Sequence, residues 1–350
     1  MAQRRWALIA DDLTGACDAA AAFAQAGFTA SVVLDEGRLA DCEPELAAYS
    51  CETRNAEEAQ AVLKTERACD RLIETGRFVL FAKIDSVLRG SPLAEVEAVS
   101  RRLGGIPAVL TPAMPAQGRL VIDGALCLVD ADTGRPLQPP CRIPAGPNVR
   151  VADAASFGDL QRLAAECLST SNTPLFAGSA GLAEAVAAEL ASRLQIPPSE
   201  RAIRPSTRPA LILIGTSHPV TEGQIAALKD SLPDVEKPLS AVALEPIRAS
   251  ALVRLTWDTP PLLDALASRL RGGEIGGLIL SGGDTARYVL DAFAAGEIIL
   301  GGEFEPGIPW GRIAGGSADK LTVVTKSGGF GGDDLLIRIL RAVAPAGVRS

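Results

Sequence analysis

Residues 6–26 read WALIADDLTGACDAAAAFAQA and contain a short apolar run, a polar turn and a stretch of small residues. The apolar run, Trp6–Ala10, predicts a buried strand, and Ala16–Ala26 predicts a helix that ends at Gly27. A buried strand that passes directly into a helix is the repeating unit of a parallel sheet covered by helices. This stretch therefore predicts an α/β fold.

The same alternation of apolar runs and helical patterns continues along the chain. We expect strands at Ala30–Leu34, Phe78–Ala82, Leu175–Ala177, Leu211–Ile214, Leu239–Leu244, Leu278–Leu280 and Leu321–Thr325. We expect helices at Glu57–Glu74, Pro92–Leu103, Ala154–Leu168, Ala180–Leu194, Val220–Ser231, Pro261–Arg271, Thr285–Ala295 and Asp333–Val343. A hairpin is expected around Asp123-Gly124, because this dipeptide favours a two-residue turn.

A proline-rich segment, QIPPSERAIRPSTRP at 195–209, divides this alternation into two halves. We predict an N-terminal domain at 1–195, a linker at 196–209 and a C-terminal domain at 210–350. Each domain is expected to hold a mainly parallel sheet flanked by helices, with the active site in the cleft between the domains. The linker would let the domains close over bound ligands.

Composition excludes several classes of protein. The 350 residues carry a formal net charge of −8, so the chain lacks the basic surplus that nucleic-acid binding needs. We recognise no signal peptide or membrane-spanning run, and the seven Cys lack CxxC spacing, which favours a cytoplasmic protein without a zinc site. The single His excludes mechanisms that need two histidines, so acid–base work would fall to Asp, Glu or Lys.

Two adjacent carboxylates, Asp11 and Asp12, follow the first predicted strand. At a strand end they could bind hydroxyl groups, coordinate Mg²⁺ or deprotonate an alcohol. The alternative is a helix N-cap with a solvated neighbour. Spacing alone does not separate these two interpretations.

A second polar turn follows the strand at Phe78–Ala82. In it, Lys83 and Arg89 suit a bound carboxylate, whereas Asp85 and Ser86 suit hydroxyl groups. A salt-bridged loop with no ligand is equally compatible with this pattern. A further candidate anion contact is Arg54, although a lone arginine is usually only a surface charge.

Three glycine-containing turns follow strands of the second half: GTSHP at 215–219, SGGDT at 281–285 and KSGGFGGD at 326–333. Backbone N–H groups freed by glycine, together with a helix N-terminus, favour phosphate. None of the turns is a Walker A or GxGxxG motif, but together they favour a nucleotide. Because Ser217 and His218 are sequence neighbours and no GxSxG elbow is present, we expect a structural or nucleotide-contacting histidine rather than a triad base.

Taken together, these turns resemble one family, the four-carbon acid sugar kinases, also described as the domain of unknown function 1537. Eight segments carry the resemblance in order: IADDLTGACDAA (9–20), KIDSVLRGS (83–91), PAMPAQGR (112–119), GSAGLA (178–183), GTSHPVTEGQI (215–225), SGGDTA (281–286), EPGIPWG (305–311) and TKSGGFGG (325–332). They span nearly the whole chain.

The resemblance implies an N-terminal domain that binds the sugar acid and a C-terminal domain that binds ATP. It implies phosphorylation of the terminal 4-hydroxyl of erythronate, threonate or a 3-oxo-tetronate. Residues implied to face the sugar acid are Asp11, Asp12, Arg54, Lys83, Asp85 and Arg89. Residues implied to face ATP are Ser217, Gly282, Gly283, Asp284, Thr285 and Gly328. The turns themselves add Ser86 as a candidate substrate contact and Gly329 as a candidate nucleotide contact.

For the mechanism we expect Mg²⁺ to bridge the nucleotide phosphates while Asp12 or Asp11 accepts the hydroxyl proton. Lys83 and Arg89, with Arg54, would hold the substrate carboxylate. Asp85 competes for the role of base, as does Asp333 or Asp334 beside the last glycine turn. Partners are expected to be small molecules, with no nucleic acid and no membrane; a homodimer is one possible assembly.

Two other functions remain compatible with the sequence. A ribokinase-like sugar kinase would use Gly331-Gly332-Asp333 as an anion hole beside its base, within one main domain and a lid. A non-catalytic sugar-acid sensor would need no nucleotide site, against which the glycine turns argue. A Rossmann dehydrogenase is disfavoured because no GxGxxG follows the first strand.

Overall fold

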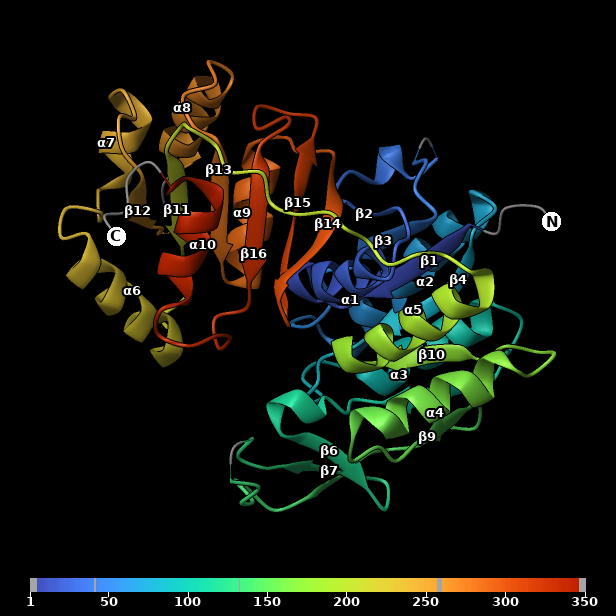
Figure 1. The fold of residues 1–350 in the computed structure, drawn as a ribbon. Helices are drawn as coiled ribbons and strands as arrows, with labels where there is room; N and C mark the ends of the chain where they lie inside the picture. Colours follow the sequence, from blue (N-terminus) through green and yellow to red (C-terminus); the bar gives the residue numbers. More distant parts are fainter. Residues whose placement is uncertain (1–4, 41, 132, 257–259, 346–350) are drawn as a thin grey trace. The chain divides into compact units, whose positions relative to one another are not determined.

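The computed structural model describes residues 5–40, 42–131, 133–256 and 260–345 (Figure 1). It divides into two compact units, each with its own core. Unit 1 comprises residues 1–32 and 37–199, and unit 2 comprises residues 33–36 and 200–350. Within the described residues, no helix is both long and apolar enough to cross a membrane.

Unit 1 is built on a sheet whose strands are buried on both faces. The strand order is β2 (Ala30–Val33), β3 (Leu46–Ser50), β1 (Trp6–Ala10), β4 (Phe78–Lys83), β10 (Leu175–Gly178), β5 (Ala108–Thr111) and β9 (Val149–Val151). The pairings from β3 to β9 are all parallel. Because such strands have helices on both sides, they consist almost entirely of apolar residues.

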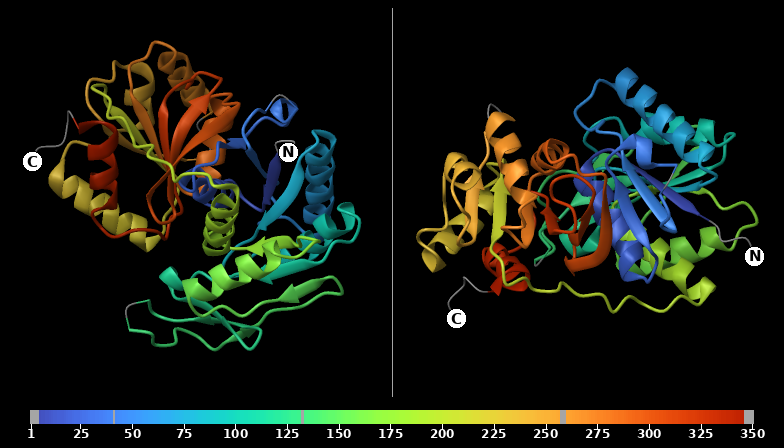
Figure 2. Two further views of the ribbon diagram at one scale, coloured as in Figure 1. Left: turned by 45° about the vertical axis from the view of Figure 1, so that its right-hand side comes forward. Right: turned by 90° about the horizontal axis from the view of Figure 1, so that it is seen from above.

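Helices cover both faces of this sheet (Figure 2). On one face α1 (Leu13–Gln25) packs on α5 (Ala180–Leu194), which packs on α4 (Phe157–Leu168); on the other, α2 (Glu58–Glu74) packs on α3 (Pro92–Arg102). The small residues of α1 are almost all buried, because this helix lies between the sheet and α5.

A separate antiparallel sheet of unit 1 confirms the predicted hairpin. It consists of β6 (Arg119–Ile122), β7 (Ala125–Leu128) and β8 (Cys141–Arg142). Asp123 and Gly124 form its turn with φ of 51° and 70°, the two positive values that a type I′ turn requires. Short 3₁₀ helices lie at Glu36–Arg38 and Pro115–Gln117.

Unit 2 has a sheet of mixed direction. Its order is β12 (Ala251–Arg254), β11 (Ala210–Ile214), β13 (Gly277–Ser281), β16 (Thr322–Lys326), β15 (Ile308–Ala314) and β14 (Glu297–Glu305). The first four strands are parallel, whereas β15 and β14 are antiparallel. The helices are α6 (Pro219–Ser231), α7 (Leu239–Leu244), α8 (Pro260–Leu270), α9 (Gly283–Ala292) and α10 (Leu335–Val343).

One strand prediction is wrong: Leu239–Leu244 forms the helix α7. A six-residue apolar run has no decisive period, and its alanines and leucines favour a helix. Only Leu239, Val242 and Ala243 of this run are buried, which is helical spacing. The edge strand is supplied instead by β12, which the sequence analysis missed together with β3, β5, β14 and β15.

Each parallel sheet contains a point at which the strand order reverses. In unit 1 the chain passes from β1 to β3 on one side and then to β4 on the other; in unit 2 it passes from β11 to β12 and then to β13. Ligands of open α/β sheets bind beyond the carboxyl ends of the strands at such points. The turns after β1, β4, β11 and β13 are therefore the places where function is expected.

Candidate functional site

The turn after β1 in unit 1 presents both predicted carboxylates. Asp12 is the N-cap of α1: its Oδ1 accepts the Gly15 N–H at 2.7 Å and its Oδ2 accepts the Thr14 hydroxyl at 2.7 Å. Asp11 is buried beside it. Gly15 is required here, since a Cβ would lie 2.6 Å from Asp12 Oδ1 and 3.0 Å from Lys83 Nζ. Asp12 is thus an N-cap as the alternative predicts, but its neighbour Asp11 is buried rather than solvated. The turn also brings Lys83 to the carboxylates.

Arg54 binds both of these carboxylates. Its Nε and Nη2 donate to the two Asp11 carboxylate oxygens at 2.8 Å each, and its Nη1 and Nη2 donate to Asp12 at 2.5 and 2.7 Å. The backbone holds the arginine in place, because the N–H groups of Thr53 and Arg54 donate to the Asp11 carbonyl at 2.9 and 3.2 Å. Arg54 is therefore a fixed centre of the site rather than a surface charge.

A buried carboxylate that the sequence analysis missed binds Thr53, the residue that precedes this arginine. Glu95, on α3, accepts the hydroxyls of Thr53 at 2.6 Å and Thr65 at 3.1 Å. Burial raises the pKa of Glu95, against which the Thr53 hydrogen bond acts. Gly90 packs on the Arg54 backbone, where a Cβ would lie 3.1 Å from the carbonyl oxygen.

The turn after β4 adds a second ion pair. Arg89 donates through Nε and Nη2 to Asp85 Oδ2 at 3.1 and 2.6 Å, and Asp85 Oδ1 accepts the Val87 N–H at 3.0 Å. Arg54 Nε lies 3.6 Å from Asp85 Oδ2, so the two turns meet. Ser86 is half-buried on the same loop.

Lys83, the last residue of β4, has a different environment. It is buried, and its Nζ donates to the Ile84 carbonyl at 3.0 Å. No ion pair joins Lys83 to any carboxylate within the described residues. By contrast, Arg54 and Arg89, also predicted to hold a substrate carboxylate, are occupied by carboxylates of the chain.

Burial and ion pairing shift the acids in opposite directions. Burial raises the pKa of Asp11 although the Arg54 hydrogen bonds oppose it. For Asp85, burial is outweighed by the hydrogen bond from Arg89 and the charges of Arg54 and Arg89, which hold its pKa at about 2. Arg119 also faces this cluster: burial lowers its pKa, and the charge of Asp85 acts against that change. Arg119 ends the segment 112–119, but its residue type alone gave no signal.

The unit 1 cluster is close to electrically neutral, because Asp11, Asp12 and Asp85 face Arg54, Lys83 and Arg89. It offers several carboxylate acceptors and charged donors within one small space. A polyhydroxy compound matches such a surface, since each hydroxyl can both donate and accept. A ligand carboxylate would add a negative charge, for which Lys83 is the buried cation without an ion-pair partner.

In unit 2 the three glycine turns meet at the carboxyl ends of β11, β13 and β16. A Cβ on Gly328 would lie 2.7 Å from Thr216 Oγ1, and one on Gly215 would lie 2.5 Å from Thr285 Oγ1. At Gly282, φ is 105° and a Cβ would lie 2.9 Å from the same Thr285 oxygen. Glycine therefore lets the turns touch and leaves their backbone N–H groups beside α9.

The side chain of Lys326, the last residue of β16, contacts the turns that follow β13 and β16. Its Nζ donates to Thr221 Oγ1 at 3.0 Å, to Ser281 Oγ at 3.2 Å and to the Gly328 carbonyl at 3.5 Å. All three acceptors are neutral, and burial lowers the pKa of Lys326 to about 8. The motif at 325–332 contains this lysine, yet the sequence analysis assigned it no role.

The remaining predicted nucleotide residues differ in exposure. Ser217 and Asp284 are exposed, Gly283 is half-buried and Gly329 is exposed, whereas Thr285 is buried between the turns. His218 caps α6, because its Nδ1 accepts the Val220 N–H at 3.2 Å. That use of Nδ1 agrees with a structural histidine.

No group of His, Cys, Asp or Glu suited to a metal ion occurs among the residues that the structure describes. Magnesium commonly keeps its waters and binds through one or two carboxylates plus the phosphates of a nucleotide.

Two family profiles match this chain. One, described as a sugar-binding N-terminal domain, matches residues 6–142. The other, described as a nucleotide-binding C-terminal domain, matches residues 260–336. The first match contains the whole unit 1 cluster. The second contains the turns at 281–285 and 326–333, whereas the turn at 215–219 lies outside it.

Curated relatives span the full length of the chain. A D-threonate kinase of Bordetella bronchiseptica is 29% identical, and the match covers 96% of each protein. A 3-oxo-tetronate kinase of Pseudomonas savastanoi is 24% identical, with 97% of each protein covered.

Solved structures share the fold. A Salmonella typhimurium protein, provisionally described as a tRNA synthase, has a TM-score of 0.75 at 20% identity, covering 96% of this chain and 98% of its own. A Haemophilus influenzae protein assigned to the domain of unknown function 1537 has a TM-score of 0.67 at 19% identity, covering 94% and 97%. At these identities the likeness concerns the fold alone.

The Asp85–Arg89 pair predicts a measurable titration. Because its pKa is about 2, Asp85 should stay ionised when the pH falls from about 7 to about 3. The Arg89→Gln variant loses the hydrogen bond that contributes most to lowering the pKa of Asp85. That pKa should therefore rise by about 1 unit or more, and Asp85 should begin to titrate within this pH range. The ¹³Cγ shift of labelled Asp measures it.

Arg102→Gln is the matched control, since Arg102 pairs with Asp70 at the surface of the same unit. It should leave the Asp85 signal unchanged. An Asp85 signal that is identical in wild type and Arg89→Gln would show that Arg89 does not hold this carboxylate.

Proposed function

Because this chain belongs to the four-carbon acid sugar kinase family, we propose that it transfers the γ-phosphoryl group of ATP to the terminal 4-hydroxyl of a four-carbon sugar acid. Erythronate, threonate and 3-oxo-tetronate are the proposed acceptors. The observation that carries the proposal is the pair of polar clusters at the two strand-order reversals, one rich in carboxylates and arginine, the other in glycine.

We assign the sugar acid to unit 1. The relatives named D-threonate kinase and 3-oxo-tetronate kinase support a four-carbon acid as the ligand. In this assignment the hydroxyls bind among Asp11, Asp12 and Asp85, with Ser86 as a further contact. Lys83 binds the carboxylate, since its charge has no ion-pair partner. Arg119 lies close enough to Asp85 for their charges to interact.

Arg54 and Arg89 have a positioning role in this proposal. Both are paired with carboxylates of the chain, so their direct contribution to a ligand carboxylate is smaller than the sequence suggested. By binding Asp11 and Asp12 together, Arg54 fixes where two acceptors stand. Removing one partner from a buried ion pair of this kind costs about 3–5 kcal/mol of stability.

We assign the nucleotide to unit 2. The glycine turns fit a triphosphate, because Cβ atoms at Gly215, Gly282 and Gly328 would fill the space between them. Ser217, Gly283, Asp284 and Gly329 are proposed nucleotide contacts, whereas buried Thr285 would act by holding the turns. Lys326 supplies a positive charge beneath them.

Phosphoryl transfer depends mainly on positioning and charge neutralisation. Bound with the nucleotide, Mg²⁺ would neutralise charge on the phosphates. Asp284 and Asp333 are exposed carboxylates within the turns. Asp12 or Asp11 would orient the 4-hydroxyl and accept its proton. Burial raises the pKa of Asp11, whereas the pKa of Asp85 is held at about 2. Asp11 is therefore the better proton acceptor of these two carboxylates.

The ribokinase-like alternative receives less support. It requires one main domain, whereas the chain divides into two units, and it leaves the cluster around Arg54 without a role. Asp333, its proposed base, packs against Gly223, where a Cβ would lie 2.9 Å from Asp333 Oδ1.

A screen of acceptors tests the proposal. ADP release should require one of the stereoisomers of erythronate or threonate, or a 3-oxo-tetronate, together with ATP and Mg²⁺. The ³¹P signal of the product should be a triplet, because a phosphate on the terminal carbon couples to two protons. A doublet would place the phosphate on another carbon, and no ADP release with any acceptor would contradict the assigned activity.

Substitution of the carboxylates tests the base. Asp11→Asn or Asp12→Asn should lower kcat by about 10²–10⁴-fold while the affinity for ATP stays unchanged, because unit 1 holds no nucleotide in this proposal. Asp70→Asn, on the surface of the same unit, is the control. Near wild-type turnover in both of the first two variants, with loss in Asp85→Asn, would move the base to Asp85.

The pKa of Lys326 predicts a pH dependence of nucleotide binding. Below pH 8 the ammonium is charged and attracts phosphate; above it the charge is lost in the free protein. The Kd for ATP should therefore be flat below about pH 8 and weaken by up to about tenfold per pH unit above it. Calorimetry between about pH 7 and about pH 9.5 measures this.

Lys326→Met should weaken the binding of ATP at about pH 7 and abolish the dependence of the Kd on pH. The control is Lys229→Met, which removes an exposed lysine paired with Glu236. A pH dependence that persists in Lys326→Met would assign it to another group.

A further inference from the structure

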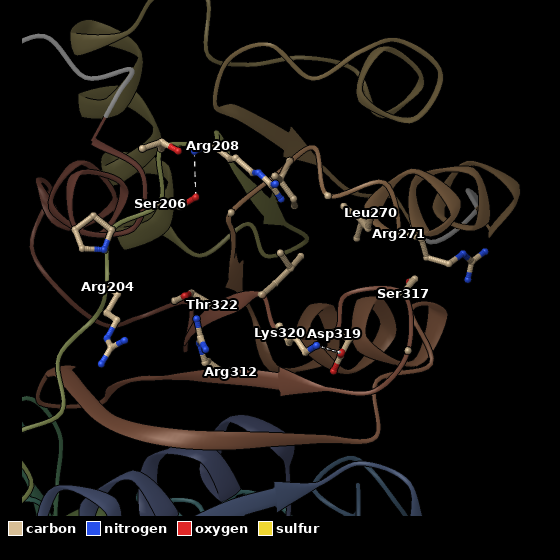
Figure 3. A pocket seen from close by; sticks show the side chains of 17 residues that line it. Arg204, Ser206, Arg208, Leu270, Arg271, Arg312, Ser317, Asp319, Lys320 and Thr322 are labelled. Atoms are coloured by element: carbon tan, nitrogen blue, oxygen red, sulfur yellow. Dashed lines mark hydrogen bonds and ion pairs between the residues drawn. The ribbon is translucent and has the colours of Figure 1, made fainter.

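A hollow of about 620 Å³ lies at the edge of the unit 2 sheet opposite to the glycine turns (Figure 3). Its walls come from the segment at 204–208, the end of α8 with the turn that follows it, β15, and the turn before β16. A volume of this size falls within the range of about 300–1,000 Å³ that is usual for small-molecule sites.

Cations dominate the walls of this hollow. Five charged side chains of one sign line it: Arg204, Arg208, Arg271, Arg312 and Lys320. The carboxylate of Asp319 stands among them, bound to the Gly315 N–H at 2.8 Å and lying 3.9 Å from Lys320 Nζ. In a chain with a net charge of −8, such a local surplus is a specific feature of this edge.

The four arginines of the hollow differ from four other arginines of unit 2, which pair with carboxylates. Those pairs are Arg254 with Glu222, Arg269 with Glu274, Arg287 with Asp291 and Arg338 with Glu305. Within the described residues, none of the four hollow arginines makes an ion pair. They come from three segments that the fold brings to one hollow: Arg204 and Arg208 lie on 204–208, Arg271 follows α8 and Arg312 lies on β15 (Figure 3).

We propose that this hollow is a second anion site, which binds a small polyanion carrying at least two phosphate groups. Arginine suits phosphate because its planar guanidinium donates two parallel hydrogen bonds. Several arginines from different segments can engage separate phosphate groups of one ligand. The hydroxyls of Ser206 and Thr322, which also line the hollow, add neutral donors.

The hollow is separate from the proposed nucleotide site. It adjoins the first residues of β11, β13 and β16, whereas the glycine turns follow their last residues. A five-residue strand spans about 17 Å, so one ligand cannot occupy both places. The inference therefore does not depend on the kinase proposal.

Binding of inorganic tripolyphosphate to the full chain, measured by calorimetry at low salt, tests the site. The double variant Arg208→Gln/Arg312→Gln should bind about tenfold or more weakly than wild type. The matched control Arg254→Gln/Arg338→Gln removes the same charge from two paired arginines and should change the Kd by less than about twofold. All four residues are at least partly exposed, so the variants should fold.

Lys326→Met separates the two sites, since it should leave tripolyphosphate binding at the hollow intact. Competition by ATP and by fructose 1,6-bisphosphate then distinguishes a nucleotide from a sugar phosphate as the source of the phosphates. The inference is overturned if wild type does not bind at about 1 mM, if both double variants weaken equally, or if Lys326→Met alone abolishes binding.

Discussion

Parallel pairing of strands that are buried on both faces is the constraint on which the rest of this structure depends. Strands such as β1 and β11 carry no polar side chain along their length, so polar groups appear only where a strand ends. Parallel direction brings these ends to one edge of each sheet. The reversal of strand order then leaves the turns after β1 and β4, and those after β11 and β13, next to a space where a ligand fits.

The two edges differ in how they handle charge. In unit 1, Arg54 gathers Asp11, Asp12 and Asp85 into a nearly neutral cluster that suits hydroxyl groups. In unit 2, the carboxylates of the glycine turns, Asp284 and Asp333, are exposed. Buried Lys326 donates to neutral acceptors only. One edge therefore suits a polyol acid and the other suits the phosphates of a nucleotide, as the proposed activity requires.

Much of this arrangement can be predicted from the sequence, because strand ends followed by Asp, Lys or Gly are visible as local patterns. The parts that could not be predicted depend on tertiary contacts. The strand that positions Arg54, β3, is rich in alanine and resembles a helix as much as a strand. Without that strand the sequence shows Arg54 only as a lone arginine. Glu95 resembles a surface residue of α3 until Thr53 and Thr65 are placed against it. Lys326 follows an apolar run, and nothing in that pattern indicates that its side chain is buried. The run at Leu239–Leu244 has no decisive period, so it does not distinguish a strand from a helix.

The central claim is that each unit binds its own substrate, and hydrogen–deuterium exchange of the full chain tests it most directly. A non-hydrolysable ATP analogue alone should protect amides at 215–218, 281–285 and 326–329. The sugar acid alone should protect amides at 11–15 and 83–90. Protection of the unit 1 turns by the nucleotide analogue, or of the glycine turns by the sugar acid, would contradict the account.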